Sequence, residues 1–214
     1  MPARERPLVE AFYGISSPWA YFGAPRLYDI VERTGARLRL RPIRIIEANG
    51  GIPLRTRPDP RQAYHAVELD RWRRQLGMEL NLKPRFYPCR TIEPAAQAVI
   101  AIDRAGLDAR SFSFAIQRAL WAEERDIADL DTLKAIARNT LGDDAVPLVS
   151  KPQQPAIVAA WNDNLDEAER LGIFGTPTYV VNGELFWGQD RLDFVERALL
   201  TVSPMPAPPL APAP

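Results

Sequence analysis

Apolar residues recur along this chain with two different periods, and the first part alternates between strand and helix. Residues 8–13 form a short apolar run typical of a buried strand, and residues 36–46 alternate apolar and polar positions as a second strand does. Between them, residues 19–34 carry apolar side chains at helical spacing. A strand–helix–strand unit with so short a crossover predicts a parallel pair of strands.

The middle of the chain has a helical pattern throughout. After a loop rich in turn-forming residues at 47–59, apolar positions recur with helical spacing as far as Gly172. Breaks at Gly, Pro or Asp divide this part into predicted helices at residues 60–77, 92–106, 109–124, 130–141 and 153–171. A connector bounded by prolines, residues 84–88, separates the first of these helices from the second.

The strand period then returns. Residues 177–181 and 184–187 are two strand-like runs joined by Asn182-Gly183, a strong hairpin signal, and a last amphipathic helix follows. The order βαβ, helices, ββα predicts an α/β protein with a thioredoxin-like fold and a large all-helical insertion. The expected parts are a discontinuous thioredoxin-like domain (1–46 and 173–203), a helical insertion domain (47–172) and a disordered proline-rich tail (204–214).

Composition narrows the class of protein. The chain of 214 residues is 46% hydrophobic and 25% charged with a net charge of zero, which is ordinary for a globular protein. The first residues lack the apolar segment of a signal peptide, and no apolar run has the length of a membrane span, so we expect a cytoplasmic protein. The single cysteine, Cys89, excludes an internal disulfide and a cysteine-based metal site, and no metal is predicted. The single histidine, His65, lies among apolar residues at helical spacing and is predicted to pack rather than to catalyse.

Positive charge is concentrated in residues 37–90, which hold 13 Lys and Arg against 5 Asp and Glu. Most of these cations are arginines, which bind carboxylates through paired hydrogen bonds. Each can be a solvated surface residue, but together they also fit a cleft that attracts small anions. No DNA-reading motif or aromatic-interleaved basic strand is present, so nucleic acid is not a predicted partner.

The first predicted helix begins at Ser17-Pro18-Trp19-Ala20. A serine before a proline is typical of an N-cap followed by proline at the first helical position. A strand, a short turn and this tetrapeptide have the form of a thioredoxin-type Cys-x-x-Cys site without its two cysteines. Ser17 is therefore either an N-cap alone or a hydroxyl that donates a hydrogen bond to a sulfur brought by a ligand. Dithiol exchange at this position is excluded.

Two further segments suit the same site. Gly175-Thr176-Pro177 precedes the third strand, where thioredoxin-like folds carry a cis-proline whose preceding residue pairs with a peptide ligand. Gln189 and Asp190 precede the last helix. Asp190 either caps that helix or binds an α-amino group while the helix N–H groups hold an α-carboxylate.

These motifs together resemble those of the 2-hydroxychromene-2-carboxylate isomerases, bacterial relatives of kappa-class glutathione transferases in the DsbA-like branch of thioredoxin folds. The resemblance covers about residues 8–200 and is carried by residues 12–21, 61–64, 70–72, 173–178 and 186–192. It implies glutathione as the cofactor, a small anionic aromatic molecule as the substrate and a homodimer as the assembly.

The resemblance also implies a role for each site residue. The catalytic serine that stabilises the glutathione thiolate falls on Ser17, and the glutathione-binding residues fall on Asn49, Thr176, Pro177, Gln189 and Asp190. We expect the substrate to be bound by Trp19, Arg61, Tyr64 and Trp72. The chain departs from the common family residues at Gly14, Ala20, Glu68 and Gln189, which affects the expected substrate more than the glutathione site.

The expected function is a glutathione-dependent isomerisation of 2-hydroxychromene-2-carboxylate to trans-o-hydroxybenzylidenepyruvate. Two alternatives fit the same residues. One is a kappa-type glutathione transferase or peroxidase that acts on other electrophiles. The other is a non-catalytic binding module that keeps the thioredoxin-like groove, and formation of a glutathione thiolate would distinguish it from the two enzymes.

Overall fold

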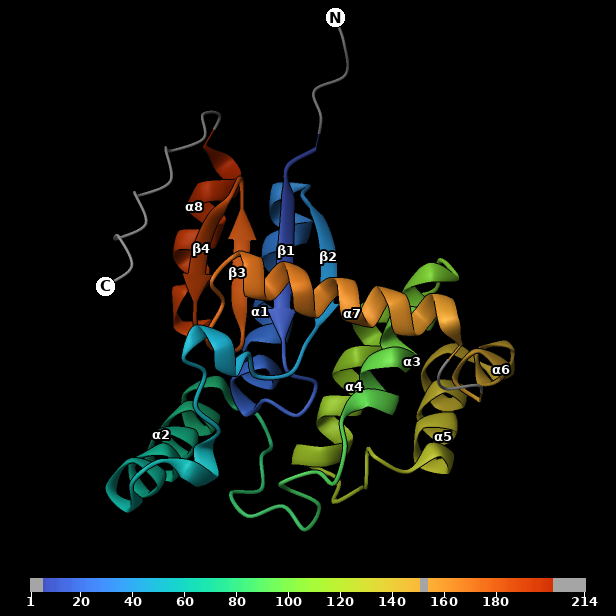
Figure 1. The fold of residues 1–214 in the computed structure, drawn as a ribbon, viewed down its shortest axis with the longest axis horizontal. Helices are drawn as coiled ribbons and strands as arrows, with labels where there is room; N and C mark the ends of the chain where they lie inside the picture. The colour runs from blue at the N-terminus through green and yellow to red at the C-terminus, as the bar shows by residue number, and fades with distance from the viewer. Residues whose placement is uncertain (1–5, 151–153, 202–214) are drawn as a thin grey trace, which may run out of the picture.

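The described residues contain a four-stranded mixed sheet with helices on both faces (Figure 1). The structure is a computed structural model that describes residues 6–150 and 154–201. β1 and β2 are parallel, whereas β3 is antiparallel to both β1 and β4. The predicted parallel pair and C-terminal hairpin are therefore confirmed. The sheet order is β2-β1-β3-β4, with β1 (Leu8–Tyr13), β2 (Arg37–Pro42), β3 (Thr178–Val181) and β4 (Glu184–Trp187).

The helices follow the predicted periodicity, and all five helices predicted between the second and third strands are present. The α-helices are α1 (Pro18–Thr34), α2 (Asp59–Leu76), α3 (Glu93–Arg104), α4 (Ala109–Trp121), α5 (Leu130–Leu141), α6 (Val146–Val149), α7 (Pro155–Arg170) and α8 (Leu192–Leu200). Short 3-10 turns lie at η1 (Glu47–Asn49), η2 (Leu54–Thr56), η3 (Asp143–Ala145) and η4 (Gln189–Arg191).

The structure differs locally from the sequence-based expectation. The strand predicted over 36–46 ends at Pro42, because β1, with which it pairs, ends at Tyr13. The segment 47–59 contains two 3-10 turns instead of irregular loop alone, and α6 has too few residues to produce a helical period. The first residue of the helix predicted at 153–171 and the predicted disordered tail lie outside the described residues.

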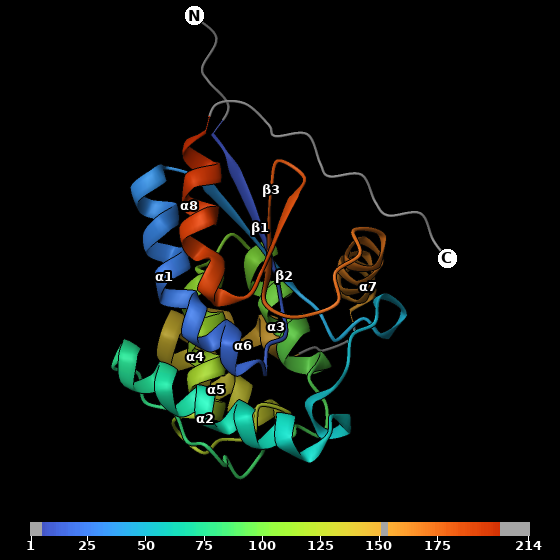
Figure 2. The ribbon, with the colours of Figure 1, turned by 90° about the vertical axis from the view of Figure 1, so that its left-hand side faces the viewer.

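Helices α1 and α8 cover one face of the sheet and α7 covers the other (Figure 2). Successive side chains alternate between these faces, as they do in any strand. Phe12 and Val180 pack with Ala168 of α7, whereas Val9 and Ala11 belong to the cluster formed with α1 and α8. The central strands are apolar on both sides because both of their faces are covered.

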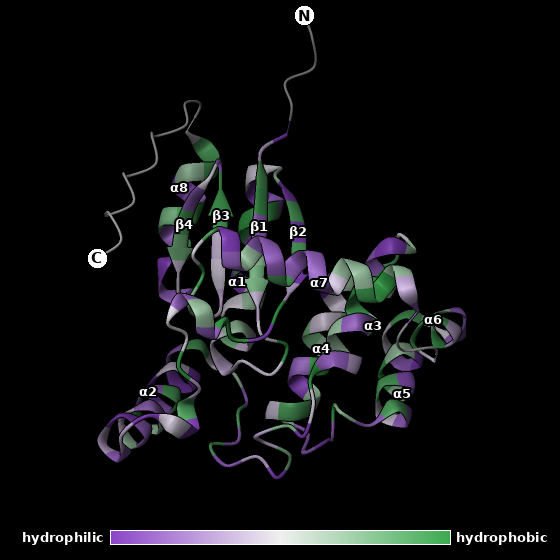
Figure 3. Cartoon of the chain, viewed as in Figure 1, coloured by the Kyte–Doolittle hydropathy of each residue, from purple (hydrophilic) through white to green (hydrophobic). Residues whose placement is uncertain are grey.

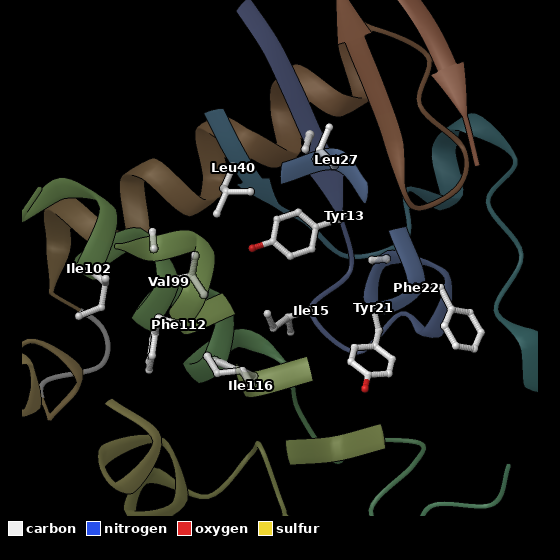
Figure 4. Packing of buried hydrophobic residues seen from close by; sticks show 14 of the residues in the cluster. Tyr13, Ile15, Tyr21, Phe22, Leu27, Leu40, Val99, Ile102, Phe112 and Ile116 are labelled. Atoms are coloured by element: carbon white, nitrogen blue, oxygen red, sulfur yellow. The ribbon is translucent and has the colours of Figure 1, made fainter. Parts of the chain in front are cut away.

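The main hydrophobic core continues from the sheet into the helices between β2 and β3 (Figure 4). Tyr13, at the end of β1, lies in one buried cluster with Phe112 and Ile116 of α4. Its hydroxyl shares a 2.7 Å hydrogen bond with Ser113 Oγ, and burial raises the pKa of Tyr13, so the phenol stays protonated. The division that separates residues 47–172 as a domain stays a proposal, and its boundary crosses a shared core.

Helix α2 is mostly exposed, and only Leu69 of its residues is buried. Figure 3 shows much of this helix as hydrophilic. It contacts the beginning of α1 through His65, whose ring meets that of Trp19 edge to face at 5.3 Å. This contact brings the exposed α2 close to the turn that contains Ser17.

The backbone of α1 approaches η4 closely at Gly23. A Cβ atom placed on Gly23 would lie 2.6 Å from the hydroxyl of Tyr179 and 2.9 Å from Cβ of Gln189, both buried residues. Alanine normally stabilises a helix interior relative to glycine by about 1 kcal/mol. At this position we expect the opposite sign.

Gly23→Ala should lower the free energy of unfolding by about 1–3 kcal/mol, because overpacking against buried neighbours forces the backbone to shift. Chemical denaturation of parent and variant, followed by circular dichroism, measures the difference. A variant that is more stable than the parent would show that α1 and η4 separate easily.

Candidate active site

Ser17 caps α1 as the sequence predicts. Its backbone is extended, with φ −78° and ψ 123°, and Pro18 occupies the first helical position. The Ser17 hydroxyl oxygen accepts a hydrogen bond from the N–H of Ala20 at 3.3 Å. The backbone N–H of Ser17 bonds to the carbonyl of Gly14 at 2.9 Å, which closes the turn between β1 and α1.

The peptide bond between Thr176 and Pro177 is cis, as predicted, and it lies beside this turn. Ser17 Oγ is 3.4 Å from the carbonyl oxygen of Thr176, to which it donates a long hydrogen bond. A Cβ atom on Gly14 would lie 3.4 Å from Thr176 Oγ1 and 3.5 Å from Cβ of Ser17. Two segments from opposite ends of the chain therefore meet at one point.

Electrostatics at this point favour an anion. The N-terminus of a helix carries free N–H groups and a partial positive charge. The first turn of α1 contains no acidic residue, so no nearby carboxylate of that turn opposes the charge. The site can therefore stabilise a thiolate or a carboxylate placed beside Ser17.

Gln189 and Asp190 differ in their surroundings. Gln189 is 2% exposed, and its carbonyl oxygen and Oε1 both accept hydrogen bonds from Arg26 of α1. Asp190 is exposed and forms an ion pair with Arg191 at 2.9 Å. No side chain caps α8, so the helix-cap alternative for Asp190 is wrong. The backbone N–H of Gly188 bonds to the carbonyl of Pro177 at 2.9 Å and links this segment to the cis-proline.

Asn49 has contacts that serve the fold. Its Nδ2 donates to the carbonyl oxygens of Ala168, Glu169 and Ile173 at 3.0–3.3 Å, where α7 ends. The carbonyls of Ala168 and Glu169 also accept backbone N–H groups from Ile173 and Gly172, so the Asn49 amide adds a second bond to each and fastens the segment 47–49 to the end of α7. The ligand-binding role expected for Asn49 stays a prediction.

The four residues expected to bind the substrate lie in different environments. Trp19 is partly buried beside Ser17, and Trp72 is partly buried against the main core. Tyr64 is 58% exposed, with the guanidinium of Arg71 5.9 Å above its ring, and Arg61 is exposed. The structure therefore places Trp19 at the site and leaves the other three along α2.

His65 packs against Trp19, in agreement with the packing role predicted for it. Burial and the charge of Arg57 lower the pKa of His65 below its usual value, so the imidazole is neutral at pH 7.

The residue roles missed by the sequence reasoning are those of Arg26, Phe174 and Trp187. The rings of Phe174 and Trp187 form an edge-to-face pair at 4.8 Å, and they are 44% and 54% exposed. The indole of Trp187 occupies the space where a Cβ on Gly175 would lie, directly before the cis-peptide. The motifs at residues 173–178 and 186–192 contain these aromatic residues, and no local pattern marks Arg26.

The described residues contain no group of three or more His, Cys, Asp or Glu side chains that could hold a metal ion. None of the described helices is long and apolar enough to cross a membrane.

Comparison with known proteins shows the same thioredoxin-like fold. A model of the DSBA-like thioredoxin domain matches residues 8–200. A 2-hydroxychromene-2-carboxylate isomerase from Sphingobium xenophagum is 29% identical over 197 residues, which cover 90% of this chain and 97% of that protein.

Two solved structures share the fold. One is a selenomethionine form of 2-hydroxychromene-2-carboxylate isomerase, with a TM-score of 0.68 and 22% identity over 90% of this chain and 94% of that one. The other is the cytosolic disulfide reductase DsbM from Pseudomonas aeruginosa with GSH. Its TM-score is 0.65 and its identity 22%, over 91% of this chain and 100% of that one.

Cys89 should be unreactive in the folded protein. It packs partly buried against the main core, and burial, together with the charge of Asp126, raises the pKa of its thiol to about 12. Because only the thiolate is nucleophilic, alkylation by iodoacetamide at pH 8 should be roughly a hundredfold slower in the folded protein than in urea. Mass spectrometry of the alkylated protein measures both rates, with Cys89→Ala as the unlabelled control. Equal rates would show that Cys89 is an accessible thiol.

Proposed function

This chain belongs to the family of DSBA-like thioredoxin domains, and we propose that it is a glutathione-dependent isomerase of an aromatic carboxylate. The substrate we propose is 2-hydroxychromene-2-carboxylate, the compound that appears in the name of the relative from Sphingobium xenophagum. The observation that carries the proposal is a serine, rather than a cysteine, at the helix N-terminus beside the cis-peptide of Thr176 and Pro177. Such a site has no sulfur of its own, which suits a ligand that brings one.

The residues around Ser17 suit a γ-glutamyl tripeptide. The backbone of Thr176, next to the cis-proline, can pair with the cysteinyl part as an added strand does. The exposed Asp190 carboxylate can hold the α-amino group of the γ-glutamyl end. When bound, glutathione supplies a thiol as the nucleophile of the reaction. The chain's own cysteine is partly buried in the segment 87–90.

Ser17 can cap the helix and stabilise a thiolate at the same time. The cap uses a lone pair of the hydroxyl oxygen, which accepts from the N–H of Ala20. The hydroxyl donates to the carbonyl of Thr176. The distance between Ser17 Oγ and the carbonyl oxygen is 3.4 Å, which is too long for a strong O–H···O bond. A small rotation of the hydroxyl proton would direct it at a thiolate and give a stronger, charge-assisted bond.

The substrate carboxylate needs a cation that is not already paired. Most arginines of α2 are paired with carboxylates of the same helix, whereas Arg61 has no acidic partner among the described residues. Arg61 is exposed near the beginning of α2, eleven residues before Trp72. We therefore propose Arg61 as the residue that binds the carboxylate. The paired arginines are Arg71, Arg73 and Arg74, which contact Glu68 or Asp70.

Ser17→Ala tests the mechanism. It should raise the pKa of the bound glutathione thiol by about one to two units, because each unit is 1.36 kcal/mol and a hydrogen bond to a charge is worth about that much. The ultraviolet absorbance of the thiolate, followed against pH in the presence of saturating glutathione, measures this pKa. Isomerase turnover at pH 7 should fall and partly recover at higher pH, and turnover of the parent should require glutathione.

Ser16→Ala is the matched control, because the neighbouring serine makes no side-chain hydrogen bond within the described residues. It should leave the thiol pKa unchanged. Superimposable titration curves for the parent and Ser17→Ala would disprove the role of Ser17. A parent protein that converts the substrate equally well without glutathione would disprove the proposed function.

Asp190→Ala should weaken glutathione binding about 10- to 100-fold, because a hydrogen bond to a charged group contributes roughly 1.5–3 kcal/mol. The free energy of unfolding should change by less than about 0.5 kcal/mol, since Asp190 caps no helix and its pair with Arg191 is exposed. Calorimetric titration and denaturation measure the two effects. Asp193→Ala removes the exposed pair with Arg197 on α8 and should affect neither quantity appreciably. Unchanged affinity in Asp190→Ala would remove Asp190 from the binding site.

A further inference from the structure

Helix α1 contacts η4 at two positions: Gly23, which has no side chain, and Arg26, which has a long one. The close approach at Gly23 places the next turn of α1 against Gln189. Arg26, three residues further along α1, reaches Gln189 with a single nitrogen, Nη1. Among the described residues, the guanidinium of Arg26 forms no ion pair with a carboxylate, and its hydrogen bonds go to Gln189.

Both acceptors of Arg26 belong to one buried residue. Nη1 lies 2.9 Å from Gln189 Oε1 and 3.2 Å from the Gln189 carbonyl oxygen. Gln189 is 2% exposed, so water cannot easily replace these bonds. The arginine therefore holds the side chain and the main chain of Gln189 at once.

The main-chain contact has a consequence for Asp190. The carbonyl of Gln189 and the N–H of Asp190 belong to the same planar peptide unit, so fixing one fixes the other. On its other side the segment is tied to the cis-proline, because the N–H of Gly188 bonds to the carbonyl of Pro177 at 2.9 Å. Arg26 and Pro177 thus hold the segment 188–190 from two directions.

We infer that Arg26 is a positioning residue for the γ-glutamyl end of the ligand, acting through the peptide unit between Gln189 and Asp190. This inference rests on the proposed function. Nine residues of helix, about 13 Å of rise, separate Arg26 from Ser17, so Arg26 sets the Asp190 end of the site without touching the thiol. It therefore affects how the protein discriminates glutathione from a thiol without the γ-glutamyl group.

The test compares glutathione with cysteinylglycine, which keeps the thiol and the cysteinyl backbone but lacks the γ-glutamyl residue. Arg26→Met should weaken glutathione binding about tenfold and change cysteinylglycine binding less than about twofold. Calorimetric titration of the full-length protein gives both dissociation constants. Arg26→Lys, with a point charge in place of the planar guanidinium, should fold like the parent and lose part of the discrimination.

Arg33→Met is the matched control, since Arg33 also joins α1 to the C-terminal part of the chain, through an exposed pair with Glu196 at 2.9 Å. It should leave the ratio of the two dissociation constants unchanged. An equal loss of affinity for both thiols in Arg26→Met and Arg26→Lys would mean a purely structural role and overturn the inference, as would an unchanged ratio. A parent protein with no affinity for glutathione would instead overturn the proposed function on which the inference rests.

Discussion

The antiparallel pairing of β1 with β3 is the interaction on which the site depends. In this register Phe12 lies opposite Thr178. The C-terminal end of β1 and the N-terminal end of β3 therefore lie side by side. Ser17 follows β1 by four residues, and Pro177 immediately precedes β3. A shift of one residue would exchange the side chains of β3 that pack toward α7 with those that pack toward α1 and α8, so the fit of each side chain to its own cluster holds the register.

Under the proposed function, one hydroxyl of Ser17 serves both folding and chemistry. An N-cap needs an acceptor, whereas a thiolate needs a donor, and a hydroxyl provides both. A cysteine in this position would supply the nucleophile itself. The serine caps the helix and supplies no sulfur, so the proposed reaction takes its sulfur from the ligand. In this proposal, the exchange of sulfur for oxygen in one side chain separates a site that reacts through its own thiol from a site that binds the thiol of a ligand.

The sequence predicts what is encoded locally. Hydrophobic periods, the Ser-Pro helix start and the Asn-Gly turn each lie within a few residues, and they were sufficient for the order of the elements and the position of Ser17. The cis-proline could be predicted only by combining Gly175-Thr176-Pro177 with the Ser-Pro helix start at the other end of the chain. The burial of Gln189 under Arg26 and the pairing of Phe174 with Trp187 could not be predicted, because they arise from the packing of elements far apart in the chain. The same holds for the 3-10 turns, which are too short to produce a period.

The continuous core around Tyr13 limits how this protein can be recombined. Because its hydroxyl bonds to Ser113 of α4, an exchange of the helices between β2 and β3 with those of a relative would also exchange the partner of β1. The packing surfaces of a chimera would not fit unless Tyr13, Phe112 and Ile116 were exchanged together with their neighbours. Substitutions in these helices are therefore constrained by the residues of the sheet that they contact. A substitution at Tyr13 that breaks this contact would need a compensating substitution in α4, and the reverse also holds.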